Sequence, residues 1–253
     1  MRVLRLSVLA IFILTSVAAV VFTTTLRSTM PAAQDIVPIN KTSGFQILQA
    51  KLVGNELKLS MKNNYAQRIT AYVLTVGGEF RVIEDFIIAE TPTEPGIRPQ
   101  QTFDRSYTLS SRRLNEAIVL QAVLLGDKTG DGDAAIYEEV LDTRLGQAVQ
   151  IKRALKVLEK YEDDTPDLEK MSTEMLAALD RPEVDTLETI KDFRRAGTRN
   201  DTTQVTLSDN VKGGLIAGRN QVLRKIEEAK VFPYKKHYLQ RMKIYYEALV
   251  KRL

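Results

Sequence analysis

The sequence predicts an α+β protein in four segments: an N-terminal signal or anchor helix (1–22), a linker (23–43), an antiparallel β-sandwich (44–132) and an all-helical region (133–253). Three observations lead to this prediction. The chain begins with basic residues and an apolar run. Its first half then contains short segments in which apolar and polar residues alternate, and its second half changes to the helical period.

The first segment has the form of an export signal. Arg2 and Arg5 precede the stretch 6–22, which is almost entirely apolar; a basic start followed by an apolar run is typical of such signals. Small residues at 16–19 indicate a cleavage point. The alternative is an uncleaved anchor, because these 17 residues are at the lower limit for crossing a hydrocarbon core of about 30 Å. In either case we expect an exported protein that is periplasmic, held at the outer face of the cytoplasmic membrane, or secreted.

The segment 23–43 is predicted to be a linker. It is rich in threonine, contains Pro31 and Pro38, and shows little periodicity. Such a composition is typical of an exposed stalk between a membrane segment and a folded domain.

The next segment has the pattern of β-strands separated by turns. Gly54-Asn55 and Gly77-Gly78 are hairpin signals between alternating stretches. The expected strands are 45–53, 56–62, 69–76, 79–88, 102–109 and 117–125, and the nearly all-apolar last one is expected at the centre of a sheet. Short strands at this spacing favour an immunoglobulin-like sandwich. The cysteine pair and tryptophan of true immunoglobulin domains are absent, so only the architecture is implied.

From Asp133, a predicted N-cap, the period is helical. One apolar stripe extends along the first long helix to residue 158, and shorter helices are expected at 167–179 and 184–195. Two further helices are expected, one from Asp209 as N-cap to residue 230 and one beginning at Pro233. Gly214 and Gly218 leave room for close helix approach, and the last two helices are expected to pack as an antiparallel pair.

Composition excludes several kinds of active site. The chain has no cysteine, so thiolate catalysis and cysteine-rich zinc sites are excluded. It has no tryptophan and a single histidine, His237, so a histidine-based triad or metal cluster has almost nothing to build from. We therefore expect no enzymatic activity. His237 lies among lysines and is interpreted as part of a solvated face; the alternative is a phosphate-binding or pH-sensitive spot.

Charge is distributed unevenly along the helical region. Residues 159–192 contain twelve acidic and four basic residues, and residues 194–253 contain fourteen basic and five acidic ones. The simplest interpretation is that acidic and basic helices lie side by side. The alternative is a basic face toward envelope polymers or phospholipid headgroups. An exported protein is not expected to bind nucleic acid.

One loop carries a candidate metal site. In the segment 126–138, Asp127, Thr129, Asp131 and Glu138 fall at positions of the calcium-loop pattern, with Glu138 at the bidentate twelfth position. The alternative is a Gly/Asp-rich turn before the first long helix, since these residues suit turns for backbone reasons alone. Calcium is the only cofactor that the sequence suggests.

The same region resembles an uncharacterised family of bacterial exported proteins. The resemblance covers roughly residues 45–158 and rests on the Gly/Asp turn, on Asp142-Thr143-Arg144-Leu145-Gly146 in the following helix, and on Asn63-Asn64 before Ile69-Thr70-Ala71. It implies an extracytoplasmic protein with a sandwich-like front half, and it implies no activity.

The favoured hypothesis is a non-enzymatic, exported binding or scaffold protein of the cell envelope. Its expected partners are the membrane, through the N-terminal segment if that segment is uncleaved, and an envelope protein on the helical half. The tyrosines at 234, 238, 245 and 246 are interpreted as packing residues, with a ligand site or a membrane interface as the alternative. Two other functions stay open: a calcium-binding structural module at the strand–helix junction, and a hydrolase that uses carboxylates.

Overall fold

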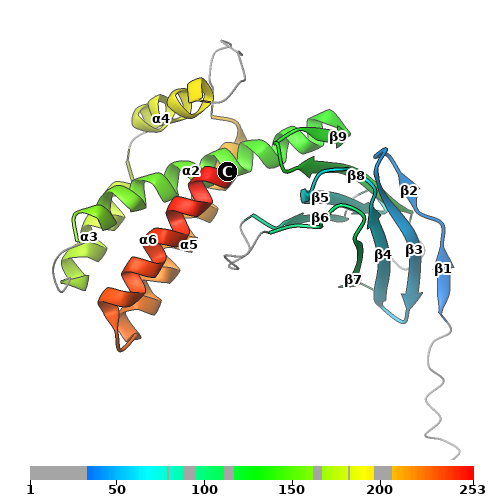
Figure 1. Ribbon diagram of the computed structural model, residues 1–253, viewed down its shortest axis with the longest axis horizontal. Coiled ribbons are helices and arrows are strands. Elements are labelled where there is room, and N and C mark those ends of the chain that lie inside the picture. Colours follow the sequence, from blue (N-terminus) through cyan, green and yellow to red (C-terminus); the bar gives the residue numbers. More distant parts are fainter. Residues whose placement is uncertain are drawn as a thin grey trace, which may run out of the picture.

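The computed structural model describes residues 33–78, 80–87, 95–110, 117–161, 167–181, 183–196 and 207–253. Two sheets form the front half and helices form the C-terminal half, which confirms the α+β prediction (Figure 1). In the described ranges no helix has the length and apolarity needed to cross a membrane. The predicted signal or anchor, 1–22, lies outside the described residues.

The front half consists of two sheets that pack face to face. The first has the strand order β1 (Gln34–Ile36), β3 (Phe45–Val53), β4 (Glu56–Asn63) and β7 (Thr102–Thr108). The second has the order β2 (Ile39–Asn40), β8 (Ile118–Leu125), β5 (Ile69–Val76) and β6 (Phe80–Asp85), with β9 (Gly130–Gly132) paired to β8. Neighbouring strands are antiparallel except for β2 and β8, which are parallel.

Alternate residues of both sheets form the core between them. Phe45, Leu57 and Met61 from the first sheet meet Tyr72 and Leu120 from the second, and all are at most 1% exposed. The predicted hairpin at Gly54-Asn55 is confirmed: Val53 pairs with Glu56, and Gly54 has a φ of 64°, which glycine adopts without steric cost. The prediction that the last apolar stretch is central is also confirmed, because β8 lies between β2 and β5.

The linker prediction for 23–43 is wrong in its last part. Residues 34–36 and 39–40 form β1 and β2, and the residues before 33 lie outside the described ranges. Strand β1 pairs with β3 and forms the edge of the first sheet, and β2 pairs with β8 of the second sheet. Both strands are too short to show an alternating pattern, so their pairing partners, which lie far away in the sequence, decide their structure.

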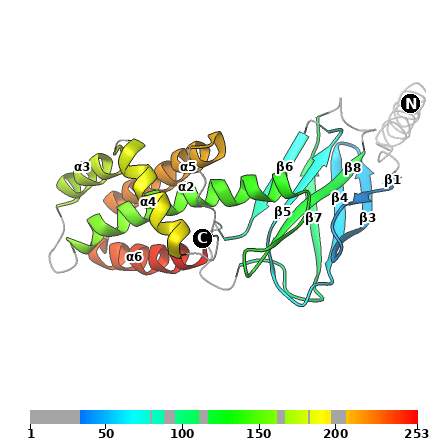
Figure 2. The ribbon, with the colours of Figure 1, turned by 90° about the horizontal axis from the view of Figure 1, so that it is seen from above.

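The helical half is built around α2 (Ala134–Glu159), which extends from the sandwich into the centre of the other helices (Figure 2). The other helices are α3 (Leu168–Leu179), α4 (Glu183–Ala196), α5 (Asp209–Val231) and α6 (Lys235–Arg252). The predicted N-cap is confirmed, since the Asp133 side chain accepts a hydrogen bond from the backbone N–H of Ala135. Near the N-terminal end of α2, Val140 packs on Ala71, Val73 and Leu124. Helix α2 therefore covers the outer face of β5 and β8.

Two helical predictions are corrected by the structure. The stripe predicted along one side of α2 is too narrow, because α2 is surrounded by other helices and is buried on several sides, as at Ala148, Val149 and Ile151. The N-cap of α5 is Ser208 and not Asp209; the Ser208 hydroxyl accepts from the N–H of Val211. Helices α5 and α6 are neighbours, as expected, and each also packs along α2.

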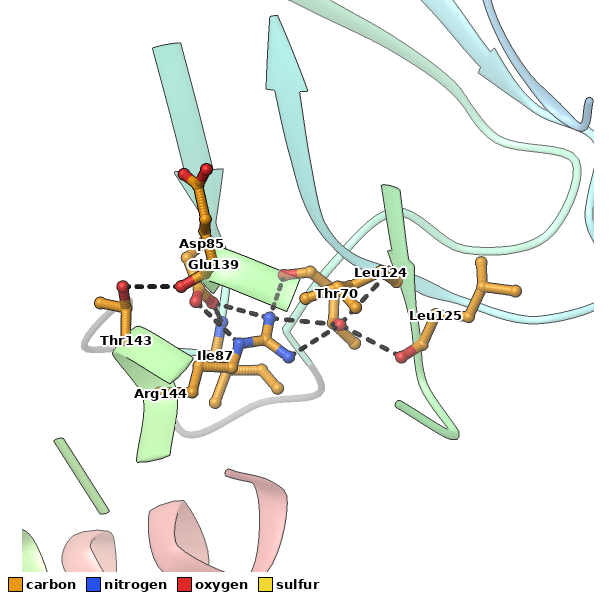
Figure 3. Close-up of polar contacts among 8 residues, drawn as sticks. All are labelled: Thr70, Asp85, Ile87, Leu124, Leu125, Glu139, Thr143 and Arg144. Atoms are coloured by element: carbon orange, nitrogen blue, oxygen red, sulfur yellow. Dashed lines mark hydrogen bonds and ion pairs between the residues drawn. The ribbon is translucent and has the colours of Figure 1, made fainter. Parts of the chain in front are cut away.

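A buried ion pair joins the two halves (Figure 3). The Arg144 guanidinium, on α2, donates through Nε to Oδ2 of Asp85 at 2.8 Å and through Nη2 to Oδ1 at 2.9 Å. It also donates to the carbonyl oxygen of Thr70 at 3.1 Å. The side chain of Arg144 is 1% exposed and that of Asp85 is 12% exposed. The pair therefore fixes α2 to the ends of β5 and β6 in a region with little water.

Glycines allow α2 and α5 to cross at close range. A Cβ atom on Gly214 would lie 2.0 Å from the carbonyl oxygen of Thr143, and one on Gly146 would lie 2.2 Å from the carbonyl oxygen of Val211. Both distances are far below van der Waals contact. The predicted close approach at Gly214 is confirmed, and Gly146 is required on α2 for the same crossing.

We predict that Gly213→Ala and Gly214→Ala have opposite effects on stability. A Cβ atom on Gly213 would meet no neighbouring element within 4 Å, so alanine should raise the free energy of unfolding by about 0.5–1 kcal/mol through helix propensity. Gly214→Ala should lower it by about 1–3 kcal/mol or more, because α2 must move away. Urea denaturation followed by circular dichroism measures both; equal effects would contradict the close crossing.

Candidate anion-binding site

Helix α2 carries a second buried arginine, Arg153, whose surroundings differ from those of Arg144. The two residues are nine positions apart, which places them on opposite sides of the helix and about 14 Å apart along its axis. Arg144 faces the sandwich and a carboxylate. Arg153 faces α4, where its Nη2 donates to the hydroxyl of Thr186 at 2.7 Å.

Arg153 is only 6% exposed, yet within the described ranges it forms no ion pair with a carboxylate. A guanidinium has five N–H donors, and Thr186 accepts from one of its nitrogens. Burial, and next the positive charge of Arg181, lower the pKa of Arg153, while the negative charge of Asp185 opposes this change. An arginine nevertheless stays charged in proteins at neutral pH. The protein thus keeps a largely buried guanidinium that, among the described residues, forms no direct ion pair and is influenced by the more distant negative charge of Asp185.

A pocket of about 420 Å³ opens beside Arg153, between α2, α3 and α4. Its walls are polar on the side of α2 and have small apolar residues on the side of α3. The lining residues are Lys152, Arg153, Lys156, Val157, Lys160, Glu174, Ala177, Ala178, Arg181, Asp185 and Thr189. Because its volume lies in the range of small-molecule sites, the pocket has room for a ligand.

Positive charge dominates this pocket. Five of its lining residues are basic and two, Glu174 and Asp185, are acidic. Glu174 is already engaged: it accepts from Lys160 at 3.3 Å and from the hydroxyl of Tyr161 at 3.0 Å. Its pKa is lowered, first by the hydrogen bond from Tyr161. Asp185 therefore faces an excess of basic side chains that includes Arg153.

This arrangement suits an oxyanion. An arginine presents parallel N–H donors that match the two oxygens of a carboxylate or phosphate, and the contact strengthens where water is excluded. Lys156 and Arg181 add charge at the same opening. The pocket can therefore bind an anionic group through Arg153 and neutralise its remaining charge with the neighbouring basic residues.

The sequence predictions did not identify this site. A signal was present, because Lys152, Lys156 and Lys160 recur every four residues and Arg153 interrupts an apolar region. Basic residues on a helix usually form a solvated face. The feature that distinguishes Arg153 is its burial against α4, which depends on contacts between segments distant in the sequence.

The residues of the predicted calcium loop have other roles in the structure. The Asp127 carboxylate accepts from the N–H and the hydroxyl of Thr129, at 3.0 and 2.6 Å, and from Gln67 at 2.9 Å. The hydrogen bond from the Thr129 hydroxyl is the main cause of the lowered pKa of Asp127. This pattern is that of an Asx-turn. Glu138 lies on α2, within the first turns of that helix.

Asp131 ties this loop to the start of the sandwich. Its carboxylate accepts from the N–H and hydroxyl of Ser43, at 2.6 and 2.9 Å, from the hydroxyl of Tyr65, and from the N–H of Gly132 at 2.9 Å. Burial alone would raise the pKa of Asp131, but these hydrogen bonds outweigh it and hold the pKa below its ordinary value. The carboxylate thus links β9 to the residues that precede β3.

In the part of the chain that the structure describes, no three His, Asp or Glu side chains are grouped closely enough to hold a metal ion. The carboxylates of Asp127 and Asp131 already accept hydrogen bonds from protein donors, which orient both side chains. The arrangement fits the turn interpretation better than a calcium site. Calcium binding at Asp127, Thr129, Asp131 and Glu138 stays a prediction.

We predict that Asp131→Asn lowers the free energy of unfolding by about 1–3 kcal/mol at pH 7, because an amide cannot accept from all of these donors. The lowered pKa of Asp131 means that its contribution is present above the ordinary carboxyl pKa of about 3.9 and is lost as the pH falls through the folded-state value. The wild type and the variant should therefore converge in acid.

Thermal melts from pH 7 down to pH 2, recorded with EDTA and with calcium, measure this convergence. Asp104→Asn, at an exposed position on β7, is the control and should change stability by less than about 0.5 kcal/mol. A stabilisation by calcium that disappears in Asp131→Asn would favour the calcium site over the turn.

Comparisons with known proteins give no match: no protein-family model, no curated protein and no solved structure is similar to this chain. The resemblance to a family of bacterial exported proteins stays a prediction.

Proposed function

We propose that this protein is a non-enzymatic, exported binding or scaffold protein of the cell envelope, and that its helical half binds an anionic ligand. One observation carries the proposal: Arg153 is 6% exposed, has no carboxylate partner in the described ranges, and lines a pocket rich in basic residues. A buried unpaired charge is costly. Such a cost is commonly retained where a ligand supplies the missing partner.

The ligand class follows from the donors. Arg153 provides a planar fork of N–H groups, and Lys156 and Arg181 provide further charge, so the ligand is expected to carry a phosphoryl or carboxylate group. The pocket volume of about 420 Å³ favours a small molecule or the end of a larger molecule, such as an anionic envelope polymer. The single histidine, His237, is exposed at the start of α6 and does not line the pocket.

We propose that 1–22 exports the protein or anchors it, that the two sheets form an immunoglobulin-like sandwich, and that this sandwich presents the helical half to an envelope partner. The support for export is the pairing of Arg2 and Arg5 with an apolar run. The support for the sandwich type is the antiparallel pairing of most strands in two packed sheets.

Isothermal titration of the full chain with inorganic pyrophosphate, and separately with citrate, tests the anion site. We predict saturable binding by at least one of these probes at low ionic strength, and weaker binding at high salt. Arg153→Met should reduce the affinity about tenfold or more, because hydrogen bonds to charged groups contribute about 1.5–3 kcal/mol each.

Arg105→Met is the matched control. Arg105 is an arginine of the sandwich with a 42% exposed side chain that pairs with Glu84 at 3.4 Å, so its replacement should leave the affinity unchanged. Circular dichroism verifies that both variants are folded. The proposal fails if neither probe gives saturable heat, or if Arg153→Met binds the probes as the wild type does.

A further inference from the structure

The turn between α5 and α6 exposes apolar side chains at a free end of the helical half, away from the sandwich (Figure 1). Val231, the last residue of α5, is 85% exposed, and Tyr234, just before α6, is 72% exposed. Phe232 and Pro233 lie between them, and the Phe232 ring packs on Tyr238 with the ring centroids 5.2 Å apart. Four consecutive apolar or aromatic residues thus form a projecting tip.

An apolar groove begins at this tip. It has a volume of about 400 Å³, and its lining includes Phe232, Tyr238, Met242 and Ile244, the last of which is 66% exposed. The groove continues along α6 from the turn. The exposed apolar surface therefore extends from the projecting tip onto the adjacent side of the helix pair.

The charge around the tip is positive. From Lys230 to Lys243 the chain has five basic residues and no acidic residue. Lys235 and Arg241 are exposed, and Arg241 lines the groove. On the α5 side, Glu227 pairs with Lys230 at 2.6 Å, and Glu228 pairs with Lys225 at 2.9 Å and accepts from the hydroxyl of Tyr238 at 2.6 Å. The excess of positive charge therefore lies on the α6 side of the turn.

We propose that the α5–α6 turn docks on an anionic phospholipid surface, with Val231 and Tyr234 inserted among the headgroups and Lys235 and Arg241 in contact with phosphate groups. Apolar and tyrosine side chains flanked by basic residues are the composition of interfacial membrane segments. Each lysine near an anionic surface contributes about 1 kcal/mol. This surface is separate from the anion-binding pocket and does not depend on that proposal.

A partner helix and a second copy of this chain fit the surface of the α5–α6 turn less well than a lipid headgroup layer does. A partner helix would occupy the groove but would leave the projecting Val231 and Tyr234 uncovered, since helix recognition uses a concave apolar surface. A second copy of this chain would bring an equal excess of positive charge against the turn, and like charges oppose each other. A lipid headgroup layer matches both the projecting shape and the charge.

Tyr234→Trp gives a direct test, because the chain contains no tryptophan and the new residue is a local reporter. The full-length variant is mixed with vesicles of phosphatidylcholine alone and with vesicles of equal parts phosphatidylcholine and phosphatidylglycerol. We expect tryptophan emission to move to shorter wavelength, and to be quenched by brominated lipid, with the anionic vesicles only. Contacts made elsewhere in the chain do not change this local signal.

Ile216→Trp is the matched control. Ile216 is also an exposed apolar residue of α5, 62% exposed, but it lies about 22 Å from Val231 along the helix axis. Its emission should not change. In the Tyr234→Trp background, Lys235→Gln and Arg241→Gln should each weaken vesicle binding about fivefold. Unchanged emission at Tyr234→Trp, or an equal change at Ile216→Trp, would overturn the proposal.

Discussion

The buried ion pair between Arg144 and Asp85 is the constraint on which the arrangement of the molecule depends. It fixes α2 to the sandwich by two hydrogen bonds to one carboxylate and a third to the backbone of β5, beside the ion pair of Arg81 with Glu139 and the apolar contacts of Val140. Such a pair is not a large net source of stability, but loss of one partner would leave a buried charge uncompensated. It therefore selects one position of α2 on the sheets, and the other helices are placed by α2.

The two buried arginines of α2 show how the same residue type serves different purposes. The charge of Arg144 is neutralised by Asp85 of β6, and this ion pair holds α2 and the sandwich together. Arg153 has no such ion pair in the described ranges, and its polar edge opens into a pocket. Beyond its hydrogen bond to Thr186, the buried charge of Arg153 has no direct carboxylate partner among the described residues, which is the physical reason for assigning it to binding. The apolar turn between α5 and α6 is a comparable departure from the usual composition of a protein surface.

The sequence predicted those features that depend on local periodicity and turn chemistry. The strands β3, β5 and β8 were recognised from alternating or continuous apolar residues, and the start of α2 from Asp133 as a cap. The strands β1 and β2 were missed because three and two residues carry no measurable period, and their partners are distant. The Gly/Asp loop showed a calcium pattern, whereas folding brings Ser43 and Tyr65 to Asp131 as hydrogen-bond donors. Neither the pairing of Arg144 nor the lack of a partner for Arg153 could be predicted, since both depend on which distant segments pack on α2.

The most direct test of this account compares the free energies of unfolding of Arg144→Met and Arg153→Met, measured by urea denaturation in a buffer without multivalent anions. Arg144→Met should lose about 3–5 kcal/mol, because it leaves Asp85 buried without its partner. Arg153→Met should be as stable as the wild type or more stable, because it removes a desolvated charge that has no carboxylate partner in the described ranges. If Arg153→Met loses as much stability as Arg144→Met, then Arg153 is a structural residue and the assignment of the pocket to anion binding is wrong.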